Sequence, residues 1–335
     1  MRNLYFGRRK FLSISLLATL VGLSGCGFSR NRRTLYAFID SLPKELIREL
    51  PSHWQYKTLE NNLSVETVDF RSKEFATDML AIGDGWLGAF QPEDFLSLEA
   101  DELFSRLNNQ AGKFLNALED GYQKKILPIG VSPWVMVFRN SDTLIDKAKE
   151  SWEVLLDPAL KDQIILPNSP RLLISLVDKI RAPDRLQELR LQAKTFDDRN
   201  SLNWLLSGRA KVAVLPLQRC MSSLIRDPRL NVALPEEGAP LNWTLLMRPF
   251  SSQNATPLSW IEECWQFPVK DKLLAKGWIP PIDYSEFSRG PNFLVKRYQS
   301  TLLPSERVWE RCWSLPPLNQ SQIKKLGKRW TDSIP

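Results

Sequence analysis

Short apolar runs alternate with helical patterns along most of the chain beyond residue 33, and this alternation limits the folds that the chain can adopt. Residues 35–39 and 78–82 have the composition of buried strands, and a helix beginning at a proline is predicted at 43–50. Strand followed by helix is typical of an α/β fold in which helices flank a mixed sheet. A chain of 335 residues is long enough for two such lobes.

Two apolar segments are predicted to connect the lobes. Residues 126–137 are apolar but are interrupted by Pro128, Gly130 and Pro133, as expected of a segment that crosses from one lobe to the other. Residues 242–248 predict a strand that returns. We therefore expect residues 34–130 and 248–335 to form lobe one and residues 131–247 to form lobe two. Further helices are predicted near 112–125, 151–157, 171–180, 201–206, 258–266 and 271–276, and strands at 164–166 and 211–215.

The first 25 residues have the pattern of an export signal. Arg8, Arg9 and Lys10 precede an uncharged stretch over residues 12–25, which is shorter than the ~20 residues of a membrane span. The arginine pair favours the twin-arginine route, although the general secretory pathway uses the same kind of basic segment. Either route predicts a protein that functions outside the cytoplasm.

The segment Leu23-Ser24-Gly25-Cys26 resembles the lipobox of bacterial lipoproteins, in which cleavage before the cysteine leaves its thiol carrying diacylglycerol. An uncleaved anchor helix and a chance cysteine are the alternatives. We expect residues 1–25 to be a removed signal peptide and residues 26–33 to be a tether lipidated at Cys26. The expected location is the periplasm, with a lipid anchor in a bacterial membrane.

The charge of the chain excludes a nucleic-acid partner. The formal net charge is +7, but four of the basic residues lie in residues 1–25, which contain no acid. The remaining surface is therefore mixed rather than strongly basic. The 12 tryptophans and 16 phenylalanines are expected mainly in the core.

Cysteine and histidine usage argues against a metal site and against most catalytic sites. His53 is the single histidine, no Cys-x-x-Cys spacing occurs, and no Gly-x-Ser-x-Gly nucleophile motif lies near His53. The acid pairs Asp197-Asp198 and Glu236-Glu237 are expected to be solvated. We predict no metal, no cofactor and no catalytic residues. Beyond Cys26, the remaining cysteines either include a Cys264–Cys312 disulfide or are three buried thiols, with Cys220 the third.

Several segments, taken in order, resemble the spermidine/putrescine-binding branch of bacterial extracellular solute-binding proteins, which have the type II periplasmic-binding-protein fold. The most specific begins at Ser151-Trp152 and continues through Leu155, Pro158 and Lys161 to an apolar strand, similar to the family pattern SW-x-x-L-x-x-P-x-x-K-x-x-strand. The less specific matches are residues 35–43, 208–214, 260–261 and 273–278.

The resemblance implies a two-lobed receptor of an ABC importer that closes over a small, polyamine-like solute and presents it to a permease. Such a receptor needs no catalysis, and we expect a monomer. The resemblance also implies a set of ligand-binding residues, namely Phe38, Asp40, Ser41, Asp84, Trp86, Asn168, Ser169, Arg171, Gln218, Asn242, Trp243 and Thr244.

The expected site departs from what a polyamine requires. Ammonium groups need carboxylates and aromatic faces, yet the segment Asn168–Arg171 has no acid, and Thr244 and Pro216 stand where an acid and an aromatic residue are expected. Asp84 is the clear carboxylate that remains. A neutral or anionic solute, with Arg171 as a partner for an anion, therefore stays open. The alternative functions are a scaffold lipoprotein that has lost its ligand and, less favoured, an exported hydrolase.

Overall fold

The computed structural model describes residues 32–38, 41–59, 77–140, 142–180, 185–254, 256–287 and 296–334. The chain separates into residues 1–32 and a second unit, Arg33–Pro335, and only the second is considered below. The predicted export signal, Cys26 and Asp40 lie outside the described residues.

The first group of strands combines strands from residues 33–96 with the return strand predicted at 242–248. β1 (Arg33–Phe38) lies between β2 (Trp54–Leu59) and β3 (Met79–Gly83) and is parallel to both. β3 pairs antiparallel with β10 (Leu241–Pro249), which also pairs with the short β4 (Phe95–Leu96). The strands predicted at 35–39, 78–82 and 242–248 are thus confirmed, each within a few residues.

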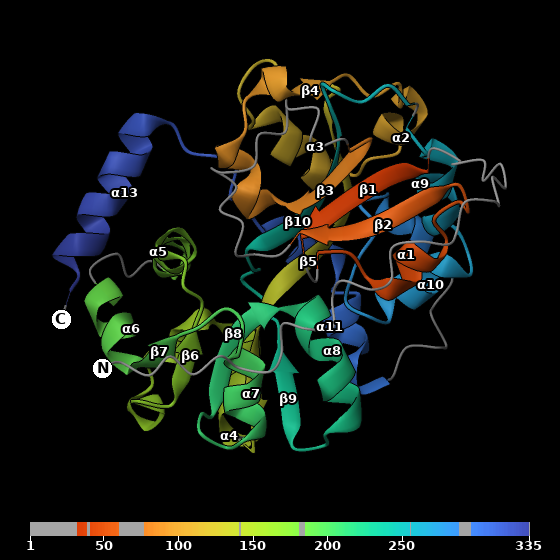
Figure 1. Ribbon diagram of the computed structural model, residues 1–335. Coiled ribbons are helices and arrows are strands. Elements are labelled where there is room, and N and C mark those ends of the chain that lie inside the picture. Colours follow the sequence, from red (N-terminus) through yellow and green to blue (C-terminus); the bar gives the residue numbers. More distant parts are fainter. Residues whose placement is uncertain are drawn as a thin grey trace, which may run out of the picture. The chain divides into compact units, whose positions relative to one another are not determined.

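β5 (Ile126–Arg139) connects this group to a second group of strands (Figure 1). Its first half pairs antiparallel with β10, and its second half pairs antiparallel with β8 (Val212–Pro216) and β9 (Leu230–Ala233). β8 is parallel to β6 (Ile164–Leu166), which is parallel to β7 (Ala193–Phe196). The resulting strand order is β2-β1-β3-β10-β5-β8-β6-β7. The crossing predicted at 126–137 is therefore a single long strand shared by both groups.

Glycine is required in β5 where the strand passes under a buried tryptophan. A Cβ atom on Gly130 would overlap Cε2 and Cζ2 of the Trp278 ring, which is fully buried. Trp278 donates its indole N–H to Thr244 Oγ1 at 3.2 Å, beside an irregularity of register in β10 between Thr244 and Leu245. Gly130 therefore marks a position where the backbone of β5 closely approaches the Trp278 side chain.

Helices cover the strands, and most begin with a polar or proline cap. Ser169 accepts a hydrogen bond from the Leu172 amide at the start of α5, and Asn319 and Gln322 form a capping box at the start of α13. The α-helices are α1 (Lys44–Arg48), α2 (Asp101–Ser105), α3 (Asn109–Asn116), α4 (Asp142–Glu150), α5 (Pro170–Lys179), α6 (Leu186–Gln192), α7 (Ser201–Leu206), α8 (Leu217–Arg226), α9 (Leu258–Cys264), α10 (Val269–Leu274), α11 (Gln299–Leu302), α12 (Glu306–Arg311) and α13 (Gln320–Asp332).

Two helical predictions need correction. The segment predicted as a helix at 151–157 is the 3-10 helix η5 (Trp152–Leu156), which ends before Pro158. The helix predicted at 112–125 is α3, which begins earlier and ends at Asn116; beyond it the chain turns through positive φ at Gly121 and Lys124. Sequence periodicity did not detect these turns.

Tryptophans fill much of the interior, as the sequence predicts. Trp152, Trp243, Trp260, Trp265 and Trp278 are almost completely buried, and each indole N–H donates to a protein oxygen at 2.8–3.2 Å. A buried indole that keeps a hydrogen bond avoids the cost of desolvating its N–H. These rings are therefore part of the core and do not form platforms for a ligand.

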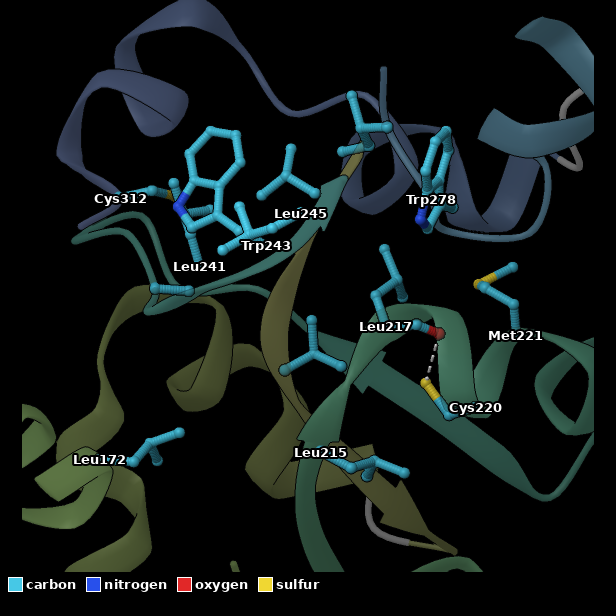
Figure 2. Packing of buried hydrophobic residues seen from close by; sticks show 14 of the residues in the cluster. Leu172, Leu215, Leu217, Cys220, Met221, Leu241, Trp243, Leu245, Trp278 and Cys312 are labelled. Atoms are coloured by element: carbon cyan, nitrogen blue, oxygen red, sulfur yellow. Dashed lines mark hydrogen bonds between the residues drawn. The ribbon is translucent and has the colours of Figure 1, made fainter. Parts of the chain in front are cut away.

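The Cys264–Cys312 disulfide considered from the sequence is not formed, and the alternative is confirmed: Cys220, Cys264 and Cys312 are buried free thiols. Cys220 donates to the Leu217 carbonyl at 3.1 Å, and Cys312 lies in the same apolar cluster as Trp243 (Figure 2). Burial raises the pKa of all three thiols, so they remain protonated at neutral pH.

Candidate functional site

Asp84 lies at the carboxyl end of β3, as the first residue of the 3-10 helix η3 (Asp84–Ala89). Its side chain is buried, and Oδ1 accepts a hydrogen bond from the Trp243 backbone N–H at 3.1 Å. Burial raises the pKa of this carboxyl to about 7, although the hydrogen bond and the nearby Arg171 both act to lower it. Without a cationic partner, burial therefore disfavours the ionised form of this carboxyl group.

Phe38 and Trp86 form a stacked pair beside Asp84. Their ring centroids lie 4.8 Å apart with an interplanar angle of 16°, and Trp86 remains 39% exposed. Ser41 follows closely, and its hydroxyl donates to the Phe38 carbonyl at 2.6 Å. The ends of β1 and β3 thus bring together Phe38, Ser41, Asp84 and Trp86, as expected of parallel neighbouring strands.

Arg171 reaches this region from the second group of strands. It lies in the first turn of α5, and its guanidinium donates a hydrogen bond to the Pro316 carbonyl. Burial lowers the pKa of Arg171, and the charge of Asp84 opposes that shift. Arg171 thus already lies near Asp84, the clear carboxylate of the predicted site.

The segment between α12 and α13 completes this region, although its sequence did not predict a binding role. Ser314 Oγ accepts the Trp243 indole N–H at 2.8 Å, and the Leu241 amide donates to the Trp313 carbonyl at 2.8 Å. Pro316 contributes only a backbone oxygen. Backbone groups have no sequence signature, so the proline-rich composition of this segment was the only available signal.

The other expected ligand residues make local contacts, several of them through the backbone alone. The backbone N–H of Asn168 donates to Asp198, Ser169 caps α5, and the backbone N–H of Gln218 donates to Ser132 Oγ at 3.0 Å. Asn242 is paired with Ser132 across β10 and β5. The Trp243 ring is fully buried and stacks on Phe114. The Thr244 hydroxyl donates to the Ser41 carbonyl at 3.4 Å.

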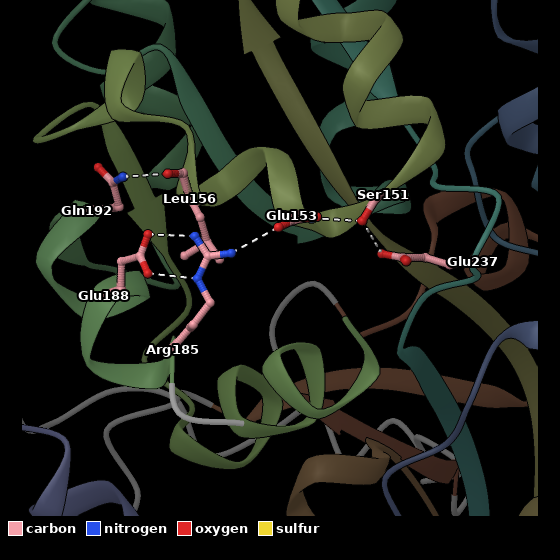
Figure 3. Close-up of polar contacts among 7 residues, drawn as sticks. All are labelled: Ser151, Glu153, Leu156, Arg185, Glu188, Gln192 and Glu237. Carbon is pink, nitrogen blue, oxygen red and sulfur yellow. Dashed lines mark hydrogen bonds and ion pairs between the residues drawn. The ribbon is translucent and has the colours of Figure 1, made fainter. Parts of the chain in front are cut away.

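The Ser151-Trp152 segment has a structural role. Ser151 Oγ and the Trp152 amide both donate to Glu237 Oε1, at 3.1 and 2.6 Å, and the Trp152 indole donates to the Gly238 carbonyl. Figure 3 shows this contact beside the bidentate Arg185–Glu188 ion pair. Glu237 is therefore a positioning group for η5.

The other acid pair considered for catalysis is also engaged. Asp197 accepts hydrogen bonds from the Arg199 and Asn200 amides and from the Trp204 indole, and Asp198 accepts the Asn168 amide. Within the described residues, no group of three or more potential metal ligands is found.

A cavity of about 490 Å³ lies between the start of α1 and helices α7 and α8. Leu42–Glu45 and Lys276 line one side, and Arg199, Asn203 and Gln218–Arg219 line the other. The first side belongs to elements around β1, and the second to elements around β8. A volume of this size is typical of small-molecule sites. Gln218 is the residue of the sequence-predicted site that lines it.

The comparisons with known proteins agree with this fold. The model of the bacterial extracellular solute-binding protein family matches residues 80–255, more than half of the chain. No helix of the described part is long and apolar enough to cross a membrane. None of the curated proteins compared matches the sequence.

Among solved structures, the chain is similar to the spermidine/putrescine substrate-binding protein PotD of Streptococcus pneumoniae, with a TM-score of 0.68, 15% identity and coverage of 90% of this chain and 98% of that one. It is also similar to the TpPotD lipoprotein of Treponema pallidum (0.66, 12%, 90% and 99%) and to a ferric binding protein of Campylobacter jejuni (0.60, 11%, 90% and 99%). These likenesses confirm the type II periplasmic-binding fold with two lobes. The chain belongs to the family of bacterial extracellular solute-binding proteins.

Proposed function

We propose that this protein is the solute receptor of an ABC importer, which captures a small solute between two lobes and delivers it to a permease. The observation that carries the proposal is the 490 Å³ cavity, because elements around β1 and elements around β8 both line it. A solute that touches both sides favours the closed arrangement of the lobes over the open one. Closure is then the signal that a permease reads.

A polyamine, the solute suggested by the family resemblance, is disfavoured. In the 490 Å³ cavity its ammonium groups would meet five cationic side chains and one acid, Glu45, whereas Asp84 and Arg171 do not line the cavity. Leaving an ammonium group without a carboxylate in a buried site is costly. The solute is therefore proposed to be neutral or anionic.

The proposed division into lobes is residues 34–130 and 248–335 against residues 131–247, with one adjustment. α13 belongs by sequence to lobe one, yet it packs against α5 of lobe two. Residues after α12 are therefore assigned to a segment that joins the two lobes. The receptor is proposed to be a monomer.

Export and anchoring complete the proposal. Residues 1–25 are proposed to be removed on export, after which Cys26 carries the lipid that holds the protein at the periplasmic face of a bacterial membrane. Mass spectrometry of the mature protein would show a lipid-modified N-terminal cysteine. A Cys26→Ser variant that still partitions into detergent would contradict the assignment.

Thermal melting of the full-length protein tests the receptor function. Ligand at a hundredfold excess over its dissociation constant stabilises the native state by about 2.7 kcal/mol. The panel contains putrescine, spermidine, amino acids, sugars and organic anions, and tryptophan fluorescence provides a second readout. A rise in melting temperature with one solute class supports the receptor. No response to any class would contradict it and would favour the scaffold alternative.

A further inference from the structure

Five cationic side chains line the 490 Å³ cavity together with a single acid, Glu45. The cations come from three parts of the sequence and from both sides of the cavity. They are Lys44 and Lys276 on one side and Arg199, Arg219 and Arg226 on the other.

Little in the described part of the chain neutralises these cations. Lys276 lies 3.9 Å from Glu45, and no other ion pair within 4 Å is found for the five among the described residues. Arg219 donates to the Arg199 carbonyl at 3.3 Å, which brings these two basic residues together. Asp198 interacts with Arg219 and Arg199 through its charge but does not line the cavity. The cavity therefore keeps an excess of positive charge.

Like charges on opposite sides of a cavity oppose its closure. An anion placed between them would reverse the sign of that interaction and would favour closure. Guanidinium groups also form bidentate hydrogen bonds with carboxylate and phosphate oxygens, which gives geometric selectivity beyond charge. A volume of about 490 Å³ accommodates a small molecule.

We propose that this cavity binds a small solute with two or more negative charges, either a polycarboxylate or a phosphate ester. The inference rests on the proposed function and names the solute class that the receptor takes. Lys44 and Lys276 hold the anion from one side, and the three arginines hold it from the other.

Isothermal titration calorimetry of the full-length protein at low salt, with citrate, glycerol 3-phosphate and inorganic phosphate as probes, tests the inference. We expect at least one probe to bind, with an affinity that falls as sodium chloride is added. The double variant Arg219→Gln, Arg226→Gln should weaken binding at least tenfold. The matched control Arg307→Gln removes an exposed arginine of α12 outside the cavity and should change the affinity by less than twofold.

Binding of citrate alone supports a polycarboxylate, and binding of glycerol 3-phosphate alone supports a phosphate ester. Silence towards all three probes overturns the inference, as does equal binding by the double variant and the wild type. If only a neutral or cationic solute of the thermal-melting panel stabilises the protein, the anionic class is overturned but the receptor function is not. Thermal melting without ligand shows whether the double variant is folded.

Discussion

At the scale of single residues, Asp84 makes the stability of the protein depend on pH. Burial raises the pKa of its carboxyl group from 3.8 to about 7. Between these two pH values the native state keeps a proton that the unfolded state has lost. Stability from this group is therefore present at low pH and decreases as pH rises towards 7. The cause is burial of the carboxyl group next to Trp243.

We predict that Asp84→Asn becomes more stable relative to the wild type, by about 2 kcal/mol, as pH rises from about 5.5 to about 8.5. Urea unfolding at both pH values measures the difference. Asp227→Asn is the control, because Arg229 holds the pKa of Asp227 at about 2 and the group stays ionised throughout. A constant difference for Asp84→Asn at both pH values would contradict the prediction.

Gly130 provides a second test at this scale. A methyl group there overlaps the buried Trp278 ring, so we predict that Gly130→Ala destabilises the protein by about 1–3 kcal/mol. The comparison variant is Gly112→Ala in α3, where no atom lies within 4 Å of the added carbon and a gain of about 0.4–1 kcal/mol is expected. Urea unfolding curves of the two variants should move in opposite directions.

At the scale of elements, α13 is held to α5 and α6 mainly by its last turns. Figure 1 shows the helix beside α5. The Arg190 guanidinium lies 3.9 Å from the Trp330 ring centroid and donates to the Trp330 carbonyl at 2.6 Å, and Arg329 forms an ion pair with Asp178 at 2.6 Å. The contact is thus concentrated on Arg329 and Trp330.

Lys324, Lys325 and Lys328 are already exposed on α13. We predict that Trp330→Ala releases the helix, so that its backbone unfolds locally and trypsin cleaves after these lysines faster. Limited proteolysis followed by mass spectrometry measures the rate of cleavage. Ile323→Ala on the same helix is the control, since Ile323 is 47% exposed and should leave the rate unchanged. Equal cleavage of the two variants would show that Trp330 does not anchor the helix.

Sequence patterns predicted the individual elements better than their docking. The crossing along β5 could be predicted because its prolines and glycine have local effects on the backbone: proline fixes φ, and glycine allows a close approach. The docking of α13 on α5 was not visible, because it depends on an arginine and a tryptophan 140 residues apart. Similarly, Phe38, Asp84 and Trp86 follow predicted strands, whereas the five cations of the cavity share no local pattern.

At the scale of the whole molecule, the two groups of strands share β5 and depend on each other. β5 pairs with β10 through its first half and with β8 and β9 through its second half, and 12 of its 14 residues are buried. Loss of either group would expose apolar residues of the other. The two lobes should therefore not unfold independently.

We predict a single unfolding transition for the described body. Tryptophan fluorescence and far-ultraviolet circular dichroism, recorded across one urea titration, should give coincident curves. The fluorescence of Trp330 reports on α13, and that of Trp265 reports on the core of the first group of strands. In a Trp330→Phe or a Trp265→Phe variant, fluorescence and circular dichroism should still give the same unfolding midpoint. Separate midpoints would instead mean that β5 can leave one group of strands while it remains in the other. In that case closure over a solute would couple two bodies of unequal stability, and solute binding would raise the midpoint of the less stable one more strongly.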